Sequence, residues 1–178
     1  MSRVLLLVFA ALTLASTPAQ TPAPPAPVPQ ADAYVAMPGG AFQPSRSRTY
    51  RAIFDGTRGA ENPAAILPVL VMTGDVLNDL GATGVPLTNA KLAVVFHGAA
   101  VDGILDDAHY RAKFRRANPN LPVLAALKQN GVELYVCGQY LAAMKIPPAS
   151  LAHEVTLATD AELVLIELQN RGYALMSF

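Results

Sequence analysis

The sequence predicts an α/β sandwich built on a mostly parallel sheet of five strands. Five short segments that are rich in β-branched and aromatic residues alternate with segments of helical spacing after residue 50. The clearest of the short segments is Lys91–His97 (KLAVVFH), which is apolar almost without interruption. Such a run is typical of a strand that is buried on both faces of a parallel sheet. Crossovers between parallel strands should be right-handed.

The first strand and the first helix are predicted from composition and spacing. Residues 50–55 (YRAIFD) combine aromatic and β-branched side chains, and Gly56 ends the segment. A helix is expected over residues 62–80, with apolar or small side chains at Ile66, Val69, Leu70, Thr73, Val76, Leu77 and Leu80. Pro68 inside this stretch implies a kink or a later helix start.

The alternation continues to the C-terminus. The remaining elements are expected to be helices over 102–116 and 121–130, a strand over 132–137, a short helix over 138–145, a strand over 155–158, a helix ending at Gly172 and a strand over 173–178. Asp106 and Asp107 stand at a helix start, where capping explains them. Thr159 and Glu162 match a T-x-x-E capping box at the start of the last helix.

The composition excludes several functional classes. Lys and Arg number 13, equal to Asp and Glu at 13, and the pI is about 6.8, which argues against a nucleic-acid partner. The single cysteine excludes an internal disulfide and any Cys-rich zinc or iron–sulfur site. Motifs of serine hydrolases, P-loops and dinucleotide-binding folds are absent from the sequence. We therefore predict no cofactor and no metal, since His97 and Cys137 alone are a weak signal for an ion.

The N-terminal region predicts export. Arg3, the apolar run Val4–Leu14 and a small-residue stretch up to Ala19 form the pattern of a signal peptide over residues 1–19. Eleven apolar residues are too few to span a bilayer, which needs about 20, although an uncleaved anchor is the alternative. We expect a periplasmic or secreted protein without a membrane span after cleavage. Residues 20–47 are rich in Ala and Pro and are expected to be a largely disordered linker, followed by one domain over 48–178.

The candidate site lies at the carboxyl ends of the predicted strands, where ligands bind in open α/β sheets. Asp55, His97, Cys137 and the pair Thr159–Asp160 occupy these ends. Cys137 also begins the turn into a helix, whose N–H groups and dipole favour a thiolate. His97 could pair with this cysteine or shuttle a proton. The alternatives are that Cys137 is a small buried apolar residue and that His97 is structural.

Several segments resemble the DsrE/DsrF-like family, in the same order along the chain. They are residues 92–100 (LAVVFHGAA), 110–114 (YRAKF), 118–121 (NPNL), 131–139 (GVELYVCGQ) and 168–175 (LQNRGYAL). The likeness covers most of residues 50–178 and is greatest for the exported, stand-alone branch of that family.

The resemblance implies a three-layer α/β/α fold with a five-stranded parallel sheet, and homo- or hetero-oligomers that are often trimers or hexamers. Cytoplasmic relatives are sulfur carriers, which accept a persulfide sulfur on a cysteine just after the third strand and pass it to a partner. Cys137 matches that position. His97 also resembles the residue that the relatives have at the corresponding position. Met144-Lys145 departs from the Arg-Gly that many relatives have after the cysteine-bearing helix.

Three functional hypotheses follow. The first is an exported sulfur carrier, at most sulfurtransferase-like, that uses Cys137 with help from His97 and works with a sulfur-donor or sulfur-acceptor protein. Its pocket is expected to be lined by Asp55, Gly98, Asn120, Gly138, Gln139 and Thr159. The second is a non-catalytic, oligomeric binding module in which Cys137 only packs. The third is a thiol redox sensor that forms a disulfide between subunits or a sulfenic acid.

Overall fold

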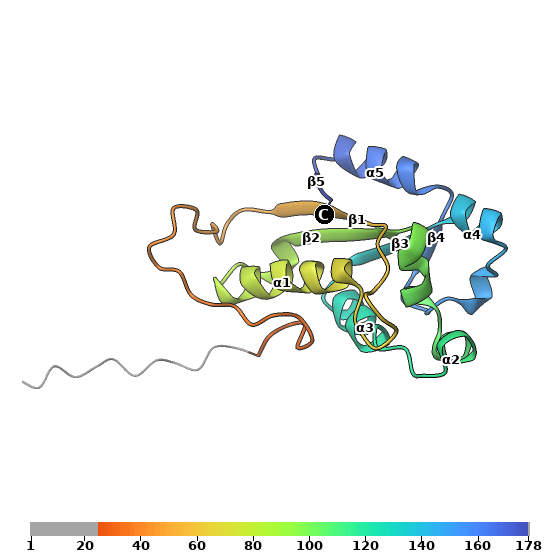
Figure 1. The fold of residues 1–178 in the computed structure, drawn as a ribbon. Coiled ribbons are helices and arrows are strands. Elements are labelled where there is room, and N and C mark those ends of the chain that lie inside the picture. Colours follow the sequence, from red (N-terminus) through yellow and green to blue (C-terminus); the bar gives the residue numbers. More distant parts are fainter. Residues whose placement is uncertain (1–24, 178) are drawn as a thin grey trace, which may run out of the picture.

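The computed structural model describes residues 25–177, which fold around a parallel sheet of five strands (Figure 1). In chain order the strands are β1 (Tyr50–Gly56), β2 (Ala90–Phe96), β3 (Glu133–Cys137), β4 (Thr156–Ala158) and β5 (Ala174–Met176). They lie in the order β4-β3-β2-β1-β5, and every neighbouring pair is parallel. The predicted fold class is confirmed.

Helices cover both faces of this sheet and give three layers (Figure 1). They are α1 (Pro68–Ala82), α2 (Asp107–Phe114), α3 (Leu121–Gln129), α4 (Gly138–Met144) and α5 (Ala161–Asn170). Short 3₁₀ turns add η1 (Leu87–Asn89), η2 (Gly98–Ile104) and η3 (Pro148–Ser150). Among the described residues, no helix has the length and apolarity needed to cross a bilayer.

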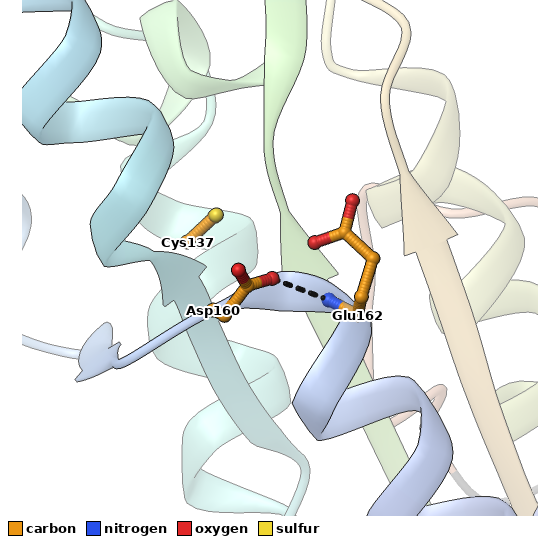
Figure 2. A group of neighbouring side chains, drawn as sticks. All are labelled: Cys137, Asp160 and Glu162. Carbon is orange, nitrogen blue, oxygen red and sulfur yellow. Dashed lines mark hydrogen bonds between the residues drawn. The ribbon is translucent and has the colours of Figure 1, made fainter.

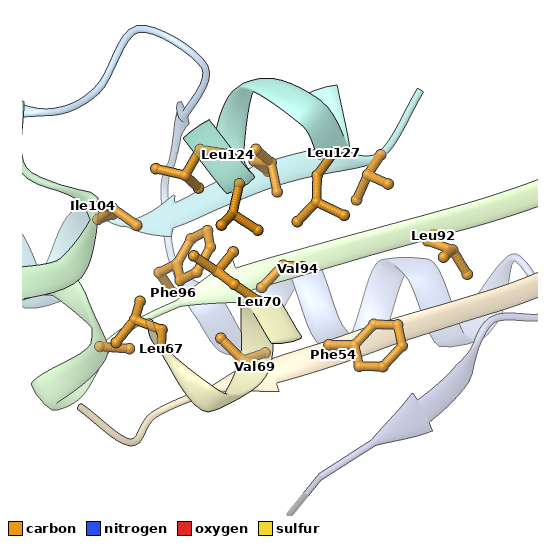
Figure 3. Packing of buried hydrophobic residues seen from close by; sticks show 14 of the residues in the cluster. Phe54, Leu67, Val69, Leu70, Leu92, Val94, Phe96, Ile104, Leu124 and Leu127 are labelled. Carbon is orange, nitrogen blue, oxygen red and sulfur yellow. The ribbon is translucent and has the colours of Figure 1, made fainter. Parts of the chain in front are cut away.

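The alternation of side chains along the strands divides the core between the two faces. Phe54, Val94 and Phe96 pack with α1 and α3 in the larger cluster (Figure 3). Ile53 and Val95 belong to a smaller cluster that includes residues of α5. Each fully buried side chain of this size contributes about 1.5–3 kcal/mol. The sheet is therefore held from both sides, with most of the apolar volume on the α1 and α3 side.

Several helix starts differ from the predicted ones. α1 begins at Pro68, in agreement with the later start that this proline implied. α2 begins only at Asp107, because η2 occupies residues 98–104 and the Asp106 carboxylate caps the helix by accepting from His109 N at 2.8 Å. The capping box predicted at Thr159 is wrong by one residue.

At that last helix, Asp160 is the N-cap residue of α5. Its backbone is extended (φ −157°, ψ 144°), and its Oδ1 accepts a hydrogen bond from Glu162 N at 2.9 Å. Since β4 ends only at Ala158, Thr159 lies in the connection and the next residue makes the cap.

The predicted signal peptide at residues 1–19 lies outside the described residues. Residues 27–32, which we call the strap and which fall within the predicted linker over 20–47, pack against α1. Val28 is fully buried, its N–H donates to Asn78 Oδ1 at 2.9 Å, and its carbonyl accepts from Asn78 Nδ2 at 3.0 Å. Gly74 makes this approach possible, since a Cβ atom there would lie 2.6 Å from Ala31 Cβ.

Candidate functional site

The parallel register brings the ends of β2 and β3 to one edge of the sheet. Phe96 is the register partner of Val136 on one side and of Gly56 on the other. His97 and Cys137 each follow one residue after the Phe96–Val136 pair, so they occupy neighbouring positions at the carboxyl edge. Both residues therefore lie at one edge of the sheet.

The same alternation that divides the core decides which face these side chains take. Ile53, Val95 and Cys137 belong to the cluster on the α5 side of the sheet. Asp55 and His97 come two residues after Ile53 and Val95, so the two-residue period of a strand places them on the same side. The candidate site therefore lies on the α5 side, at the carboxyl ends of β1, β2 and β3.

Cys137 is the last residue of β3 and the N-cap of α4. The residue is 4% exposed, and its Sγ accepts a hydrogen bond from Tyr140 N at 3.4 Å. The next residue has no room for a side chain, since a Cβ at Gly138 would lie 2.6 Å from the Ala158 carbonyl oxygen. The thiol is thus fixed in a tight junction between β3, α4 and β4.

His97 is held by Asp55 on the neighbouring strand. Its Nε2 lies 2.7 Å from Asp55 Oδ1, and the two side chains are 24% and 23% exposed. An ionised carboxylate only accepts hydrogen bonds, so Nε2 carries the proton and a neutral imidazole keeps Nδ1 as an acceptor. The structure therefore pairs His97 with a carboxylate rather than with the thiol of Cys137.

Two carboxylates approach the thiol from the start of α5 (Figure 2). The Sγ of Cys137 and one oxygen each of Asp160 and Glu162 all lie within 4.8 Å of one another. The hydrogen bond from Glu162 N fixes the Asp160 carboxylate in this group. The arrangement adds two acidic side chains to the edge that carries Asp55 and His97.

A family model describes residues 57–178 as DsrE/DsrF-like, which is more than half of the chain. The chain belongs to the DsrE/DsrF-like family. His97 and Cys137 lie inside the matched range, whereas Asp55 precedes it by two residues.

The fold of this DsrE-like chain is also found in a solved structure. A protein of unknown function from Methanobacterium thermoautotrophicum superimposes with a TM-score of 0.53 at 19% sequence identity. The match covers 72% of this chain and 99% of that one. At this identity the likeness supports the fold alone. Among curated proteins, no relative was matched.

Other predicted site residues of the DsrE-like domain gather near Cys137 or His97. Gln139 Nε2 donates to the Thr159 carbonyl at 3.4 Å, which ties the start of α4 to the β4–α5 connection. Gly98 follows His97 with φ +58°, a left-handed conformation that suits glycine, and a Cβ there would lie 3.1 Å from the Thr57 carbonyl oxygen. These residues shape the backbone around the edge.

Asn120 has a different place. It is fully buried, its Oδ1 accepts from Leu67 N at 2.8 Å, and its Nδ2 donates to Asn118 Oδ1 at 2.9 Å. It lines a pocket of about 250 Å³ together with Tyr110 and Phe114, and that pocket contains none of Asp55, His97 and Cys137. Asn120 therefore joins the β1–α1 connection to the start of α3.

A second pocket adjoins the acidic group at the thiol. It measures about 320 Å³ and includes Thr159, Asp160 and Tyr135 in its lining. Burial, together with the hydrogen bond and charge of the Glu133 carboxylate, raises the pKa of Tyr135 to about 12. The phenol is therefore neutral across the physiological range, and its O–H donates to the Glu133 carboxylate.

Sequence reasoning named Asp160 as a strand-end residue but did not connect it with the thiol, and it assigned Glu162 to helix capping alone. The available signal was positional, because both residues follow a strand that enters the same edge as Cys137. Their contact depends on how α5 docks over the sheet.

Proposed function

We propose that this DsrE-family protein is a sulfur carrier in sulfur metabolism, and that Cys137 is its persulfide acceptor. The observation that carries the proposal is the position of the single cysteine at the carboxyl end of β3, next to the His97–Asp55 pair. Ligands of open α/β sheets usually bind at this edge. Membership in the DsrE/DsrF-like family agrees with sulfur relay.

The transfer needs no external oxidant. The Cys137 sulfur attacks the terminal sulfur of a donor persulfide, R–S–SH, so that a bond forms between Sγ and this sulfur. The bond between the two donor sulfurs breaks, and the thiol proton ends on the released donor thiol. The products are Cys137–S–SH and R–SH, and the reverse chemistry delivers the sulfur to an acceptor thiol.

The role proposed for His97 is proton transfer during this exchange. Asp55 holds Nε2–H, so the imidazole presents Nδ1 as the atom that accepts a proton. The role proposed for Asp55 is to position the ring. A proton acceptor at the sheet edge supports attack by sulfur, since the thiolate is the nucleophilic form.

The burial of Cys137 restricts the donor. Since only 4% of the residue is exposed, its Sγ is within reach of a small persulfide or of a narrow cysteine-bearing segment of a partner. We propose small persulfides as the donor class for this reason.

Export and self-assembly belong to the same proposal. The N-terminal pattern supports a periplasmic or secreted protein. Large apolar side chains are exposed on α5 and on both edge strands, namely Leu157, Leu163, Ile166 and Leu175. Exposed apolar groups of this kind support a homo-oligomer, in line with the trimers or hexamers that the family resemblance implies. Sedimentation velocity on wild type and on L163E/I166E would test the assembly.

Mass spectrometry of the folded protein after incubation with a small persulfide tests the carrier function. We expect wild type to gain one sulfur, which a reductant removes, and Cys137→Ser to gain none. Because Cys137 is the sole cysteine, any adduct on the serine variant would contradict the assignment.

The packing of Cys137 among Ile53, Val95 and Ala161 favours a second candidate, a binding module in which the thiol only fills space. An alkylating reagent separates the two. A thiol that reacts only after denaturation, with no sulfur uptake in the folded state, would support the module and reject the carrier.

A further inference from the structure

We propose that Cys137, Asp160 and Glu162 form a three-ligand site for a divalent cation of the zinc class, which competes with sulfur for the same thiol. The cation-binding part does not depend on the carrier function. The competition rests on the proposed function, because it concerns the availability of the Cys137 sulfur.

The geometry of the three donors is close to that of a coordination sphere. The sulfur and the two carboxylate oxygens lie within 4.8 Å of one another. Tetrahedral zinc with bonds of about 2.3 Å to sulfur and about 2.1 Å to oxygen needs ligand atoms about 3.5 Å apart. The remaining approach of about 1 Å is within reach of the exposed Glu162 side chain, which makes no hydrogen bond in the described chain that would hold its carboxylate elsewhere.

Two of the donors are already oriented by backbone N–H groups. Tyr140 N donates to the sulfur, and Glu162 N donates to one oxygen of Asp160, whose second oxygen stays available. Hydrogen bonds of this kind orient ligands around a metal. Cys137 sits on β3 and the carboxylates on the start of α5, so both halves of the site rest on packed elements (Figure 2).

The charges of the group are uncompensated. Within residues 25–177, neither Asp160 nor Glu162 has an ion-pair partner, whereas Glu167 on the same helix pairs with Arg171 at 2.6 Å. Two carboxylates beside a nearly buried sulfur repel one another, and a divalent cation converts that repulsion into attraction. The convergence of acidic donors without a basic side chain is an observation independent of the cysteine itself.

The donor set selects the type of metal. One thiolate with two carboxylates suits a borderline cation such as Zn²⁺, with the fourth position left for water. Mg²⁺ and Ca²⁺ prefer an all-oxygen shell with six or more ligands. Binding converts Cys137–SH and M²⁺ into a sulfur–metal bond, and it releases the thiol proton to the buffer. A metal-bound sulfur has no free thiolate, so the cation blocks attack on a persulfide.

The test uses the chelator-treated full chain and needs no sulfur donor. Zn²⁺ binding is measured by calorimetry, and Co²⁺ is added as a spectroscopic probe of sulfur ligation. We expect a sulfur-to-cobalt charge-transfer band that Cys137→Ser abolishes. Asp160→Asn and Glu162→Gln should each weaken Zn²⁺ binding by about tenfold or more. Asn caps helices as well as Asp, so the first of these variants keeps the start of α5.

Glu167→Gln is the matched control, since it removes a carboxylate from the same helix away from the thiol, and its Zn²⁺ affinity should equal that of wild type. Absence of the charge-transfer band, or wild-type affinity in both ligand variants, would overturn the site. Sulfur uptake is then compared with and without Zn²⁺. Uptake that Zn²⁺ leaves unchanged would overturn the competition alone.

Failure of the carrier function has a different signature. In that case the metal-free protein takes up no sulfur, while the Co²⁺ band and its loss in the variants remain. The metal site would then be supported without the carrier function, so the same set of variants distinguishes the two proposals.

Discussion

His97 Nε2 and Asp55 Oδ1 lie 2.7 Å apart and join the ends of two neighbouring strands, β2 and β1. His109 Nδ1, on α2, makes a comparable contact with the N-cap residue Asp106 at 2.9 Å, on a helix that contributes no residue to the cluster around Cys137. Both imidazoles therefore have a carboxylate partner, but one of them lies at the sheet edge beside Cys137.

These two contacts allow a kinetic prediction for His97 that has His109 as its matched control. His97→Gln should slow sulfur uptake by Cys137 by about 100-fold, the lower end of what acid–base catalysis contributes. Asp55→Asn should slow it about tenfold, because the ring remains but loses its orientation. The rate is measured by quenched-flow mass spectrometry. His109→Gln is the control, and an equal loss in that variant would assign the effect to stability instead of proton transfer.

The close packing at Gly138 predicts that a residue with a side chain is not tolerated directly beside the site. Gly138→Ala should destabilise the fold by about 1–3 kcal/mol, because the new methyl group meets the Ala158 carbonyl oxygen at 2.6 Å. Urea denaturation followed by circular dichroism measures the change. A Cβ at Gly39 has no atom within 4 Å, so Gly39→Ala should leave the midpoint unchanged. Equal midpoints for both variants would refute the tight junction.

The contact between the strap and Asn78 predicts that the side-chain amide of Asn78 contributes to stability. Asn78→Ala should cost about 1–3 kcal/mol, because it leaves the N–H and carbonyl of the buried Val28 without their partner. Asn89, whose amide binds the Arg46 carbonyl at the surface, gives the control variant Asn89→Ala with a change below about 0.5 kcal/mol. The free energy of unfolding is obtained from urea titrations.

A double-mutant cycle makes that prediction specific. In a chain that lacks residues 1–34, Asn78→Ala should cost much less than in the full chain, because Val28 is absent. An undiminished cost would mean that Asn78 acts within α1 and that the strap is not held by it.

The raised pKa of Tyr135 predicts that its phenol ionises late in an alkaline titration of the folded protein. Its pKa is raised to about 12, whereas an ordinary tyrosine has a pKa near 10. Tyr135→Phe should remove a component near pH 12 from the near-ultraviolet tyrosinate absorbance. A raised folded-state pKa stabilises the neutral form, so the associated stability is present below pH 10 and is lost as the pH rises towards 12. A variant titration curve identical to wild type above pH 11 would contradict the assignment.

The strands could be predicted from the sequence because the pattern that indicates a strand is local. The apolar run at 91–97 requires burial on both faces, and the parallel arrangement that it implies brings Asp55, His97 and Cys137 to one edge. The pairing of His97 with Asp55 instead of the thiol was not predictable, since it depends on rotamers at the sheet edge.

Longer-range contacts were not available from the sequence for physical reasons. Asp160 and Glu162 reach the thiol only because α5 docks with its first turn over the end of β3. Asn120 lies in a motif that the family resemblance highlights, yet its amide is used inside the fold to hold Leu67 N. The strap is proline-rich and typical of disorder, yet it packs through the buried side chain of Val28 and the hydrogen bonds of this residue to Asn78.

The position of β5 has a consequence for how the chain is made. β5 pairs with β1, so one edge of β1 stays without this partner until Ala174–Met176 have left the ribosome. An open strand edge is a template for pairing with other chains, and contacts between the two ends of a domain form slowly. A nascent chain of this design therefore exposes one edge of β1 while the rest of the sheet is being made, and chaperone binding over that period would keep the edge from pairing with other chains.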